Sequence, residues 1–321
     1  MTRAPSLPVI DLSQSQAGPE TEHGVARAVD AVCRESGFFY ITGHGVPESL
    51  VESMFGCARH FFAQPADTKA RWSTKLSPIR RGWDAIGHQA LDNGKPADLL
   101  EGYNIGLEFD PADPLGDRQP RRGPNQWPDE GAAPGMRATA EAYMAALEHA
   151  SRRVMRLIAI GLALPGDYFE PFMRRPVPSM RLLHYPPHPA DAQAGQAGAG
   201  AHTDWGALTL LAQDDGGGLQ VQDAQGDWHD VPPVPGSFVV NLGDLMSRWT
   251  NDAYRSTMHR VINNVSGRDR YSIPYFFDID FHARVSALPG CFDAAHPPRY
   301  AEVTAGEHHA EKMRLARLAY G

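Results

Sequence analysis

Two histidines and one aspartate in this sequence are spaced so that they could hold a metal ion. His202 and Asp204 lie in the β-prone run AHTDWGALTLL, and residues i and i+2 of a strand point to the same face. His259 follows Asp204 by 55 residues, in STMHRVIN. Two imidazoles and one carboxylate that leave metal positions open suit non-haem Fe(II). Taken singly, each residue is also compatible with a polar strand rim or a core histidine.

An arginine and a serine begin the next β-prone run, RYSIPYFF. Arg270 and Ser272 are two residues apart and would share a strand face. A guanidinium can bind a carboxylate through two parallel hydrogen bonds, and a serine hydroxyl can donate a third. The same Arg-x-Ser pattern starts at Arg34, Arg71 and Arg284. Only the pair at 270 begins a strand, which makes it the candidate carboxylate-binding pair.

Strands that could carry these residues are expected in the second half of the chain. Short β-prone runs separated by Gly, Pro and Asp lie there at 180–185, 200–211, 219–221, 228–231, 237–242, 260–265 and 270–277. Strands at such regular spacing are typical of an antiparallel sandwich or barrel. The predicted fold class is mainly β with flanking helices, around a jelly-roll-like core.

Helices are expected mainly in the first half of the chain. Apolar residues at helical spacing predict helices over 25–33, 48–62 and 137–164, with short strands at 7–12 and 37–41. Residues 110–128 and 190–200 are expected to be loops. We therefore expect one domain over 1–321, with a helix-rich N-terminal region (1–165), a jelly-roll core holding the metal site (175–285) and a C-terminal helix (299–317).

Composition narrows the function classes. The 321 residues include 30 Lys+Arg and 38 Asp+Glu, and the net charge of −8 argues against a nucleic-acid partner. The sequence has no apolar run of about 18 residues and no signal-peptide pattern, so we expect a cytoplasmic protein without a membrane partner. Three scattered cysteines are too few for a disulfide framework or a Cys-based zinc site. No sequence pattern defines the oligomeric state.

The motifs HTD, MHRV and RYS, in this order and spacing, resemble those of Fe(II)/2-oxoglutarate-dependent oxygenases of the isopenicillin N synthase-like superfamily. LPVIDL, ESGFFYITGHGVP and the helix ending in HFF look like the N-terminal region of that family. RLLHYPP and GSFVVNLGDLMSRWTNDAYRSTMHRVIN resemble its core. The resemblance runs almost from end to end of the chain.

The resemblance implies a double-stranded β-helix, which is a cupin-like jelly roll, with a helical N-terminal region. The family's catalytic iron ligands would be His202, Asp204 and His259, and its 2-oxoglutarate-binding residues would be Arg270, Ser272 and Tyr185. Leu183 stands where many plant members carry asparagine. The implied cofactor is Fe(II), and the implied co-substrates are 2-oxoglutarate and O2.

The implied enzyme is an oxidoreductase, a non-haem Fe(II)/2-oxoglutarate-dependent dioxygenase. It would oxidise a small-molecule substrate and release succinate and CO2. Hydroxylation is the expected outcome, with desaturation or ring closure as variants set by the pocket. The identity of the substrate does not follow from the fold and the triad.

Eight residues are expected near the substrate from their place in the family's pattern: Trp83, Arg80, Arg81, Tyr103, Asn104, Arg181, Trp205 and Phe277. The aromatic residues are also compatible with core packing, and the arginines with a solvated loop or a structural salt bridge. Strand alternation places Tyr103 and Asn104 on opposite faces. His308 and His309, in the C-terminal helix, are expected to be exposed to solvent.

Other functions fit parts of the pattern. Within the superfamily, an oxidase that does not use 2-oxoglutarate, or an enzyme that forms ethylene from it, would also carry Arg-x-Ser. From other classes, the same three ligands could hold Zn2+ for hydrolysis, although no Glu or His beside them is an evident general base. A metal-free, ligand-binding jelly roll would need no triad.

Overall fold

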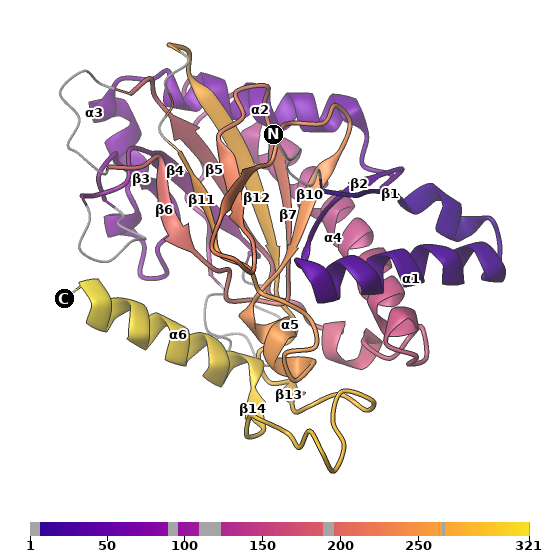
Figure 1. Cartoon of the computed structure of the whole chain (residues 1–321). Coiled ribbons are helices and arrows are strands. Elements are labelled where there is room, and N and C mark those ends of the chain that lie inside the picture. Colours follow the sequence, from indigo (N-terminus) through magenta and orange to yellow (C-terminus); the bar gives the residue numbers. More distant parts are fainter. Residues whose placement is uncertain are drawn as a thin grey trace.

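Two β-sheets lie face to face in the computed structural model of the chain (Figure 1), which describes residues 7–88, 96–108, 123–188, 196–262, 264 and 267–320. The loops expected at 110–128 and 190–200 lie largely outside these residues. Apolar side chains from both sheets fill the space between them.

The larger sheet has eight strands. In spatial order they are β1 (Val9–Asp11), β2 (Phe38–Thr42), β10 (Phe238–Leu242), β7 (Leu208–Gln213), β12 (Arg270–Phe277), β5 (Ser179–Tyr185), β4 (Glu101–Gly106) and β3 (Gly82–Asp84). The β1–β2 pair is parallel and the other pairs are antiparallel. Strands from the first third of the chain therefore extend both edges of a sheet whose centre comes from the second half.

The smaller sheet has four strands, in the order β6 (Ala199–His202), β11 (His259–Val261), β8 (Leu219–Gln222) and β9 (Trp228–Asp230). A separate two-stranded sheet pairs β13 (Arg284–Val285) with β14 (Val303–Thr304). The smaller sheet is antiparallel, and β11 pairs with β6 so that His259 lies opposite His202.

Strand alternation gives the larger sheet an inner face, toward the smaller sheet, and an outer face, toward the helices. On the inner face, Phe38, Leu183 and Val239 form one apolar cluster with Val221 and Val261 of the smaller sheet. Two packed sheets with inward apolar residues are the arrangement expected of a jelly roll. The predicted fold class is therefore confirmed.

Helices cover the outer face of the larger sheet and one end of the molecule (Figure 1). The α-helices are α1 (Pro19–Glu35), α2 (Glu48–Phe62), α3 (Ala66–Lys69), α4 (Met136–Gly161), α5 (Asp244–Trp249) and α6 (Ala305–Tyr320). Short 3-10 helices span Leu12–Gln16, Ala70–Trp72, Thr74–Leu76 and Glu170–Met173. None of the described helices is both long enough and apolar enough to span a membrane.

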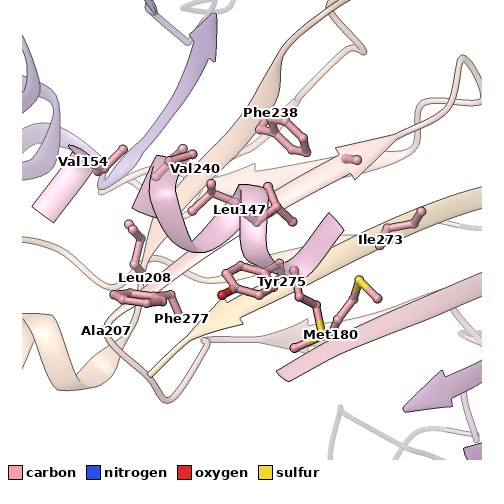
Figure 2. Packing of buried hydrophobic residues seen from close by; sticks show 14 of the residues in the cluster. Leu147, Val154, Met180, Ala207, Leu208, Phe238, Val240, Ile273, Tyr275 and Phe277 are labelled. Atoms are coloured by element: carbon pink, nitrogen blue, oxygen red, sulfur yellow. The ribbon is translucent and has the colours of Figure 1, made fainter. Parts of the chain in front are cut away.

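Helix α4 forms the centre of the outer layer. Its buried residues Tyr143, Leu147, Val154 and Ile158 recur at intervals of four and seven, which gives one apolar stripe along the helix. Figure 2 shows Leu147 and Val154 above outer-face residues of the sheet, including Tyr275. Each fully buried side chain of this kind contributes about 1.5–3 kcal/mol, so this stripe holds the helix on the sheet.

The run 200–211 does not form the single strand that we expected. It divides into β6 and β7, which belong to different sheets, and Asp204 lies in the turn between them. The backbone of this turn is bonded to α5 instead of a neighbouring strand, because the amides of Asp244 and Leu245 donate to the carbonyls of Asp204 and Trp205. His202 and Asp204 therefore converge through a turn, and not through strand alternation.

Helix α6 begins at Ala305, later than the expected range of 299–317. Thr304 and Glu307 form a reciprocal cap at its start: the Thr304 amide donates to Glu307 Oε2 at 2.7 Å, and the Glu307 amide donates to Thr304 Oγ1 at 3.1 Å. His308 and His309 are only 4% and 8% exposed, so the expectation that they face solvent is wrong. Both contact Trp205, in the turn that carries Asp204.

Candidate metal centre and active site

The three candidate ligands meet at one point between the sheets. His202 ends β6, Asp204 follows it in the turn, and His259 begins β11 directly opposite His202. One ligand atom from each residue lies within 4.8 Å of the others, and His259 Nε2 lies 3.8 Å from Asp204 Oδ1. The ring of Phe38 packs edge-on against His259, with centroids 5.3 Å apart. Strands distant in sequence thus bring together the residues that the motifs single out.

Backbone carbonyls fix both imidazoles in the tautomer that a metal requires. His202 Nδ1 lies 2.8 Å from the carbonyl oxygen of Gly200, and His259 Nδ1 lies 3.1 Å from that of Thr257. A carbonyl only accepts hydrogen bonds, so each Nδ1 carries the proton and each Nε2 presents its lone pair. Such carbonyl contacts commonly orient metal-binding histidines.

The carboxylate of Asp204 is held by one oxygen and offers the other. Its Oδ2 accepts hydrogen bonds from Thr209 Oγ1 at 2.6 Å and from Asn241 Nδ2 at 2.7 Å. Both donors lie on the inner face, on β7 and β10, where they are paired in register. Oδ1 is left on the side of the imidazoles, so the carboxylate is oriented as a single-oxygen ligand.

The charges at this point also fit a divalent cation. Burial, together with the neighbouring His259, lowers the pKa of His202 to about 4, so this imidazole is neutral at pH 7. Burial alone would raise the pKa of Asp204. The imidazoles of His259 and His202 and the hydrogen bonds to Oδ2 lower this pKa by more, so the net shift is downward. A carboxylate anion beside imidazole lone pairs forms the two-His-one-carboxylate donor set that suits Fe(II).

A buried arginine lies on the same inner face. Arg270 begins β12 and is 2% exposed, and its Nε donates to the carbonyl of Gly217. Its Nη1 and Nη2 lie 3.4 Å from Ser272 Oγ and Gln213 Oε1, and the ring of Tyr185 lies 4.6 Å from its guanidinium carbon. These partners are neutral, and in the described part of the chain no carboxylate forms an ion pair with Arg270. A buried cation with only neutral partners is suited to an anionic ligand.

Two of the expected substrate residues lie on the inner face of the sheet. Asn104 is paired with Arg181, and its amide donates to Asp84 Oδ2 at 2.8 Å. Arg181 extends over Gly102, where a Cβ would come within 3.1 Å of Nη2. Burial lowers the pKa of Arg181, so its charge lies in a poorly solvated part of the fold. Both residues thus face the space between the sheets.

Two further expected substrate residues, Trp205 and Arg80, lie outside the strands of the inner face. Trp205 directly follows Asp204, and its ring packs edge-on against His309 of α6 at 5.4 Å. Arg80 is largely exposed and lies 3.4 Å from Asp84 Oδ1. Arg80 therefore lies at the edge of the inner face, next to the partner of Asn104.

Three of the other four expected substrate residues, Trp83, Tyr103 and Phe277, belong to the outer layer, away from the triad. Trp83 donates to Glu101 Oε2 at 2.7 Å, and Tyr103 packs on Phe61 with centroids 4.7 Å apart. Phe277 is fully buried in the helix-facing core (Figure 2). Arg81 is 3% exposed, and its guanidinium lies over Gly106 on the strand face that also carries Asn104, so Arg81 is a buried residue of the inner face and not a solvated loop residue. Strand alternation explains the placement of the three aromatic residues, because they share a face with outer-layer neighbours.

Sequence reasoning missed three inner-face residues, Thr209, Gln213 and Asn241, and selected Phe277 where the neighbouring Phe276 lies on the inner face. Counting in steps of two from Arg270 leads through Ser272 to Phe276, so alternation within RYSIPYFF already favours Phe276 over Phe277. Gln213 carries no such signal, because its position depends on the pairing of β7 with β12.

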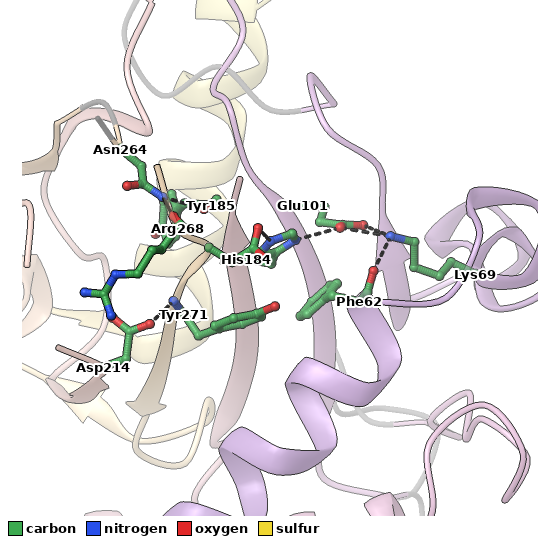
Figure 3. Close-up of polar contacts among 10 residues, drawn as sticks. Phe62, Lys69, Glu101, His184, Tyr185, Asp214, Asn264, Arg268 and Tyr271 are labelled. Atoms are coloured by element: carbon green, nitrogen blue, oxygen red, sulfur yellow. Dashed lines mark hydrogen bonds and ion pairs between the residues drawn. The ribbon is translucent and has the colours of Figure 1, made fainter. Parts of the chain in front are cut away.

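A polar network supports the strand that carries Tyr185 from behind (Figure 3). His184 lies 2.8 Å from Glu101 Oε1 and 2.9 Å from Asp269 Oδ1, and Lys69 donates to both oxygens of Glu101 at 2.9 and 2.7 Å. The ring of His184 stacks on Tyr271 at 4.9 Å. His184 thus links β5 and β12 on the side opposite the site.

Comparison with known families matches most of the chain. Residues 7–130 match a family described as the N-terminal part of non-haem dioxygenases in morphine synthesis, and residues 176–279 match the 2OG-Fe(II) oxygenase superfamily. The second match contains the triad and the buried arginine.

Individual relatives agree with these matches. The 2-oxoglutarate-Fe(II) type oxidoreductase hxnY of Emericella nidulans is 41% identical over 276 residues, which cover 85% of this chain and 79% of the relative. The 2-oxoglutarate-dependent dioxygenase citB of Monascus ruber is 39% identical over 88% of this chain and 87% of its own length.

A solved structure extends the similarity to the whole fold. A full-length Neurospora crassa protein in complex with alpha-KG superposes with a TM-score of 0.86 and 30% identity, over 97% of this chain and 96% of that one. The same protein has also been solved with alpha-KG and thymine, at a TM-score of 0.84 and 29% identity, over 97% of each chain. From these matches and the site geometry, the chain belongs to the 2-oxoglutarate- and Fe(II)-dependent oxygenase superfamily.

Proposed function

We propose that this protein is a non-haem Fe(II)- and 2-oxoglutarate-dependent dioxygenase that oxidises a small molecule and that holds its metal with His202, Asp204 and His259. The observation that carries the proposal is the buried, neutrally surrounded guanidinium of Arg270 on the same inner face as the triad. The triad alone would equally serve a zinc hydrolase, but such an enzyme has no use for a buried anion-binding arginine.

When bound at the triad, Fe(II) supplies the chemistry of the reaction: O2 is reduced while 2-oxoglutarate is decarboxylated to succinate and CO2 and the substrate is oxidised. The residues of the protein hold the metal ligands and orient them. Thr209 and Asn241 occupy Oδ2 of Asp204, so this residue would hold the metal through Oδ1 alone. The carbonyls of Gly200 and Thr257 keep the two Nε2 atoms unprotonated.

Arg270, Ser272 and Tyr185 bind the far carboxylate of 2-oxoglutarate in this proposal. The carbonyl of Gly217 accepts the hydrogen bond from Nε of Arg270. The two terminal nitrogens therefore remain available to bind both oxygens of a carboxylate. Thr209, which orients the metal ligand, and Gln213, which contacts Arg270, are four residues apart on β7, or roughly 13 Å. Side chains reaching in from both ends leave room for a small dicarboxylic acid between the arginine and the metal.

Asn104, Arg181 and Trp205 form the substrate side of the proposed site, with Arg80 at its edge. Arg181 supplies positive charge beside apolar and aromatic surfaces, which favours an anionic, partly apolar small molecule. The Neurospora crassa relative was solved with thymine, a small planar molecule, which supports a substrate of that size here. Hydroxylation is the proposed outcome.

We also propose a single cytoplasmic domain over 1–321. β1 to β4 of the first third and β5, β7, β10 and β12 of the second half form one sheet, which supports a single folding unit. The three cysteines are unpaired, as is usual in a reducing compartment.

The test is anaerobic titration of the protein with Fe(II) and 2-oxoglutarate, followed by admission of O2. A visible charge-transfer band and subsequent succinate are expected. Asp204→Ala should abolish both. Arg270→Ala should raise the 2-oxoglutarate concentration required by about 10- to 100-fold, because charge-assisted hydrogen bonds are lost.

Arg284→Ala is the matched control for the arginine, since it alters another Arg-x-Ser pair, one that is exposed and bonded to Glu302. Its 2-oxoglutarate requirement should equal that of the wild type. Absence of both the band and succinate in the wild-type protein, with any candidate substrate, contradicts the proposal.

A further inference from the structure

The C-terminal helix is attached to the turn that carries Asp204. His308 Nε2 donates to the carbonyl of Trp205 at 3.0 Å, and the ring of His309 packs edge-on against Trp205 and Phe281 at 5.4 and 5.5 Å. Figure 1 shows α6 running beside α5 and below β6. The helix therefore contacts the turn between β6 and β7, which carries the ligand Asp204.

One carboxylate connects this helix with both ligand segments. Asp244, the first residue of α5, accepts at Oδ2 from Lys312 Nζ at 2.6 Å and from Thr203 Oγ1 at 3.1 Å. Its Oδ1 accepts from Ser256 Oγ at 2.6 Å, and its amide donates to the carbonyl of Asp204 at 2.8 Å. Asp244 thus contacts α6, the turn after β6, and the segment that leads into β11.

The two hydroxyl groups lie close to the ligands along the chain. Thr203 stands between His202 and Asp204, and Ser256 is followed by Thr257, whose carbonyl orients His259. Because a single carboxylate binds both hydroxyls, it fixes the distance between the segment that supplies two ligands and the segment that supplies the third.

We propose that Asp244 is a positioning residue for the metal centre and that Lys312 holds it in place, so that docking of α6 raises the affinity of the triad for a divalent metal. The proposal rests on the proposed function insofar as His202, Asp204 and His259 bind the metal. Lys312 is the cation bonded to this carboxylate among the described residues, and the pair is partly shielded, with side chains 32% and 14% exposed. A shielded, charge-assisted hydrogen bond restrains the carboxylate more than its two hydroxyl donors alone would.

Two substitutions separate this role from general stability. Asp244→Asn cannot accept all three hydrogen bonds, and loss of such an outer contact typically weakens metal binding, here by about tenfold. Lys312→Met keeps the side-chain length and removes the charge, and a partly exposed ion pair predicts a smaller loss, about threefold. Lys312→Arg should restore wild-type affinity. Arg314→Met, which removes an exposed arginine of the same helix, is the matched control.

The measurement is titration of the metal-free, full-length protein with Mn2+ alone, following free Mn2+ by electron paramagnetic resonance. The dissociation constant should rise in the order Arg314→Met, Lys312→Met, Asp244→Asn. Since Lys312 acts through Asp244, the double variant Asp244→Asn/Lys312→Met should bind no more weakly than Asp244→Asn. The thermal midpoint of the metal-free protein is recorded for every variant.

Each outcome decides a separate point. Wild-type affinity in Lys312→Met, or an equal loss from Lys312→Met with and without Asp244, overturns the proposal that α6 acts through Asp244. A lowered thermal midpoint with unchanged Mn2+ affinity assigns these residues a purely structural role and also overturns it. If the wild-type protein binds no Mn2+, the assignment of the triad as a metal site fails as well.

Discussion

At the scale of single residues, the site depends on contacts that hold each ligand in one orientation. Asp204 is the clearest case, since two donors occupy Oδ2 and leave Oδ1 for the metal. An aspartate without these donors could turn and bind through both oxygens, which would use a position needed by a co-substrate. The triad motif identifies the ligands, but the donors that orient them come from strands whose pairing the sequence does not state.

Thr209→Val tests this orientation. Valine has nearly the same shape as threonine, so the change removes one hydrogen bond to Asp204 with little change in packing. We expect affinity for Fe(II) or Mn2+ to fall by about tenfold, the usual scale for a lost outer contact of a metal ligand. Thr68→Val in α3, far along the chain from the triad, should leave affinity unchanged. Equal affinity of Thr209→Val and the wild type would show that Asn241 alone suffices.

At the scale of secondary-structure elements, one strand serves both layers of the molecule. β12 presents Arg270, Ser272 and Phe276 to the inner face, and Ile273 and Phe277 to the helices. Its limits, 270–277, and those of the helix at 48–62 were predicted correctly from composition and periodicity. The division of 200–211 into two strands was not predicted. It is caused by hydrogen bonds from α5, a helix about 40 residues later in the chain.

The neighbouring residues Phe276 and Phe277 should respond to substitution in opposite ways. Phe277→Ala empties a fully buried site in the outer layer and should lower the free energy of unfolding by about 3–5 kcal/mol. Phe276→Ala should cost much less stability, because its ring is only partly buried, and should instead raise KM for the substrate. Urea denaturation and steady-state kinetics on both variants measure this contrast. Similar stability losses would mean that both rings are core residues.

At the scale of the whole molecule, burial of a metal-binding histidine lowers the stability of the metal-free protein at acidic pH. Burial and His259 lower the pKa of His202 from 6.5 to about 4, so the unfolded chain binds a proton more readily than the folded one between these values. Stability therefore falls as pH decreases from about 6.5 to about 4. The shift corresponds to about 3 kcal/mol at most.

His202→Gln removes this titration. We expect the metal-free variant to lose less stability than the wild type between pH 7 and pH 4, by up to about 3 kcal/mol. Urea unfolding at both pH values, in the presence of a chelator, provides the comparison. Parallel losses in the two proteins would show that His202 does not titrate in this range.

Most of the overall architecture follows from the sequence, because the regular spacing of the β-prone runs and the order of the three motifs are local properties of the chain. The surroundings of the site do not follow from the sequence. His308 and His309 are polar residues in a helix whose apolar pattern is weak, and only the position of α6 against Trp205 explains their burial. Residues that face a partner distant in the chain carry no local sign of it.

The interleaved order of the larger sheet has a consequence for how the chain is made. β2 pairs with β1 on one edge and with β10 on the other, and β4 likewise pairs with β3 and with β5, so one edge of each early strand has no partner until much later residues have been synthesised. Pairing of such distant segments is slow to form, and unpaired strand edges are prone to aggregation. The growing chain therefore exposes the edge of β2 that pairs with β10 until residue 242 has been synthesised, which makes this protein a natural client for chaperones that bind apolar nascent segments.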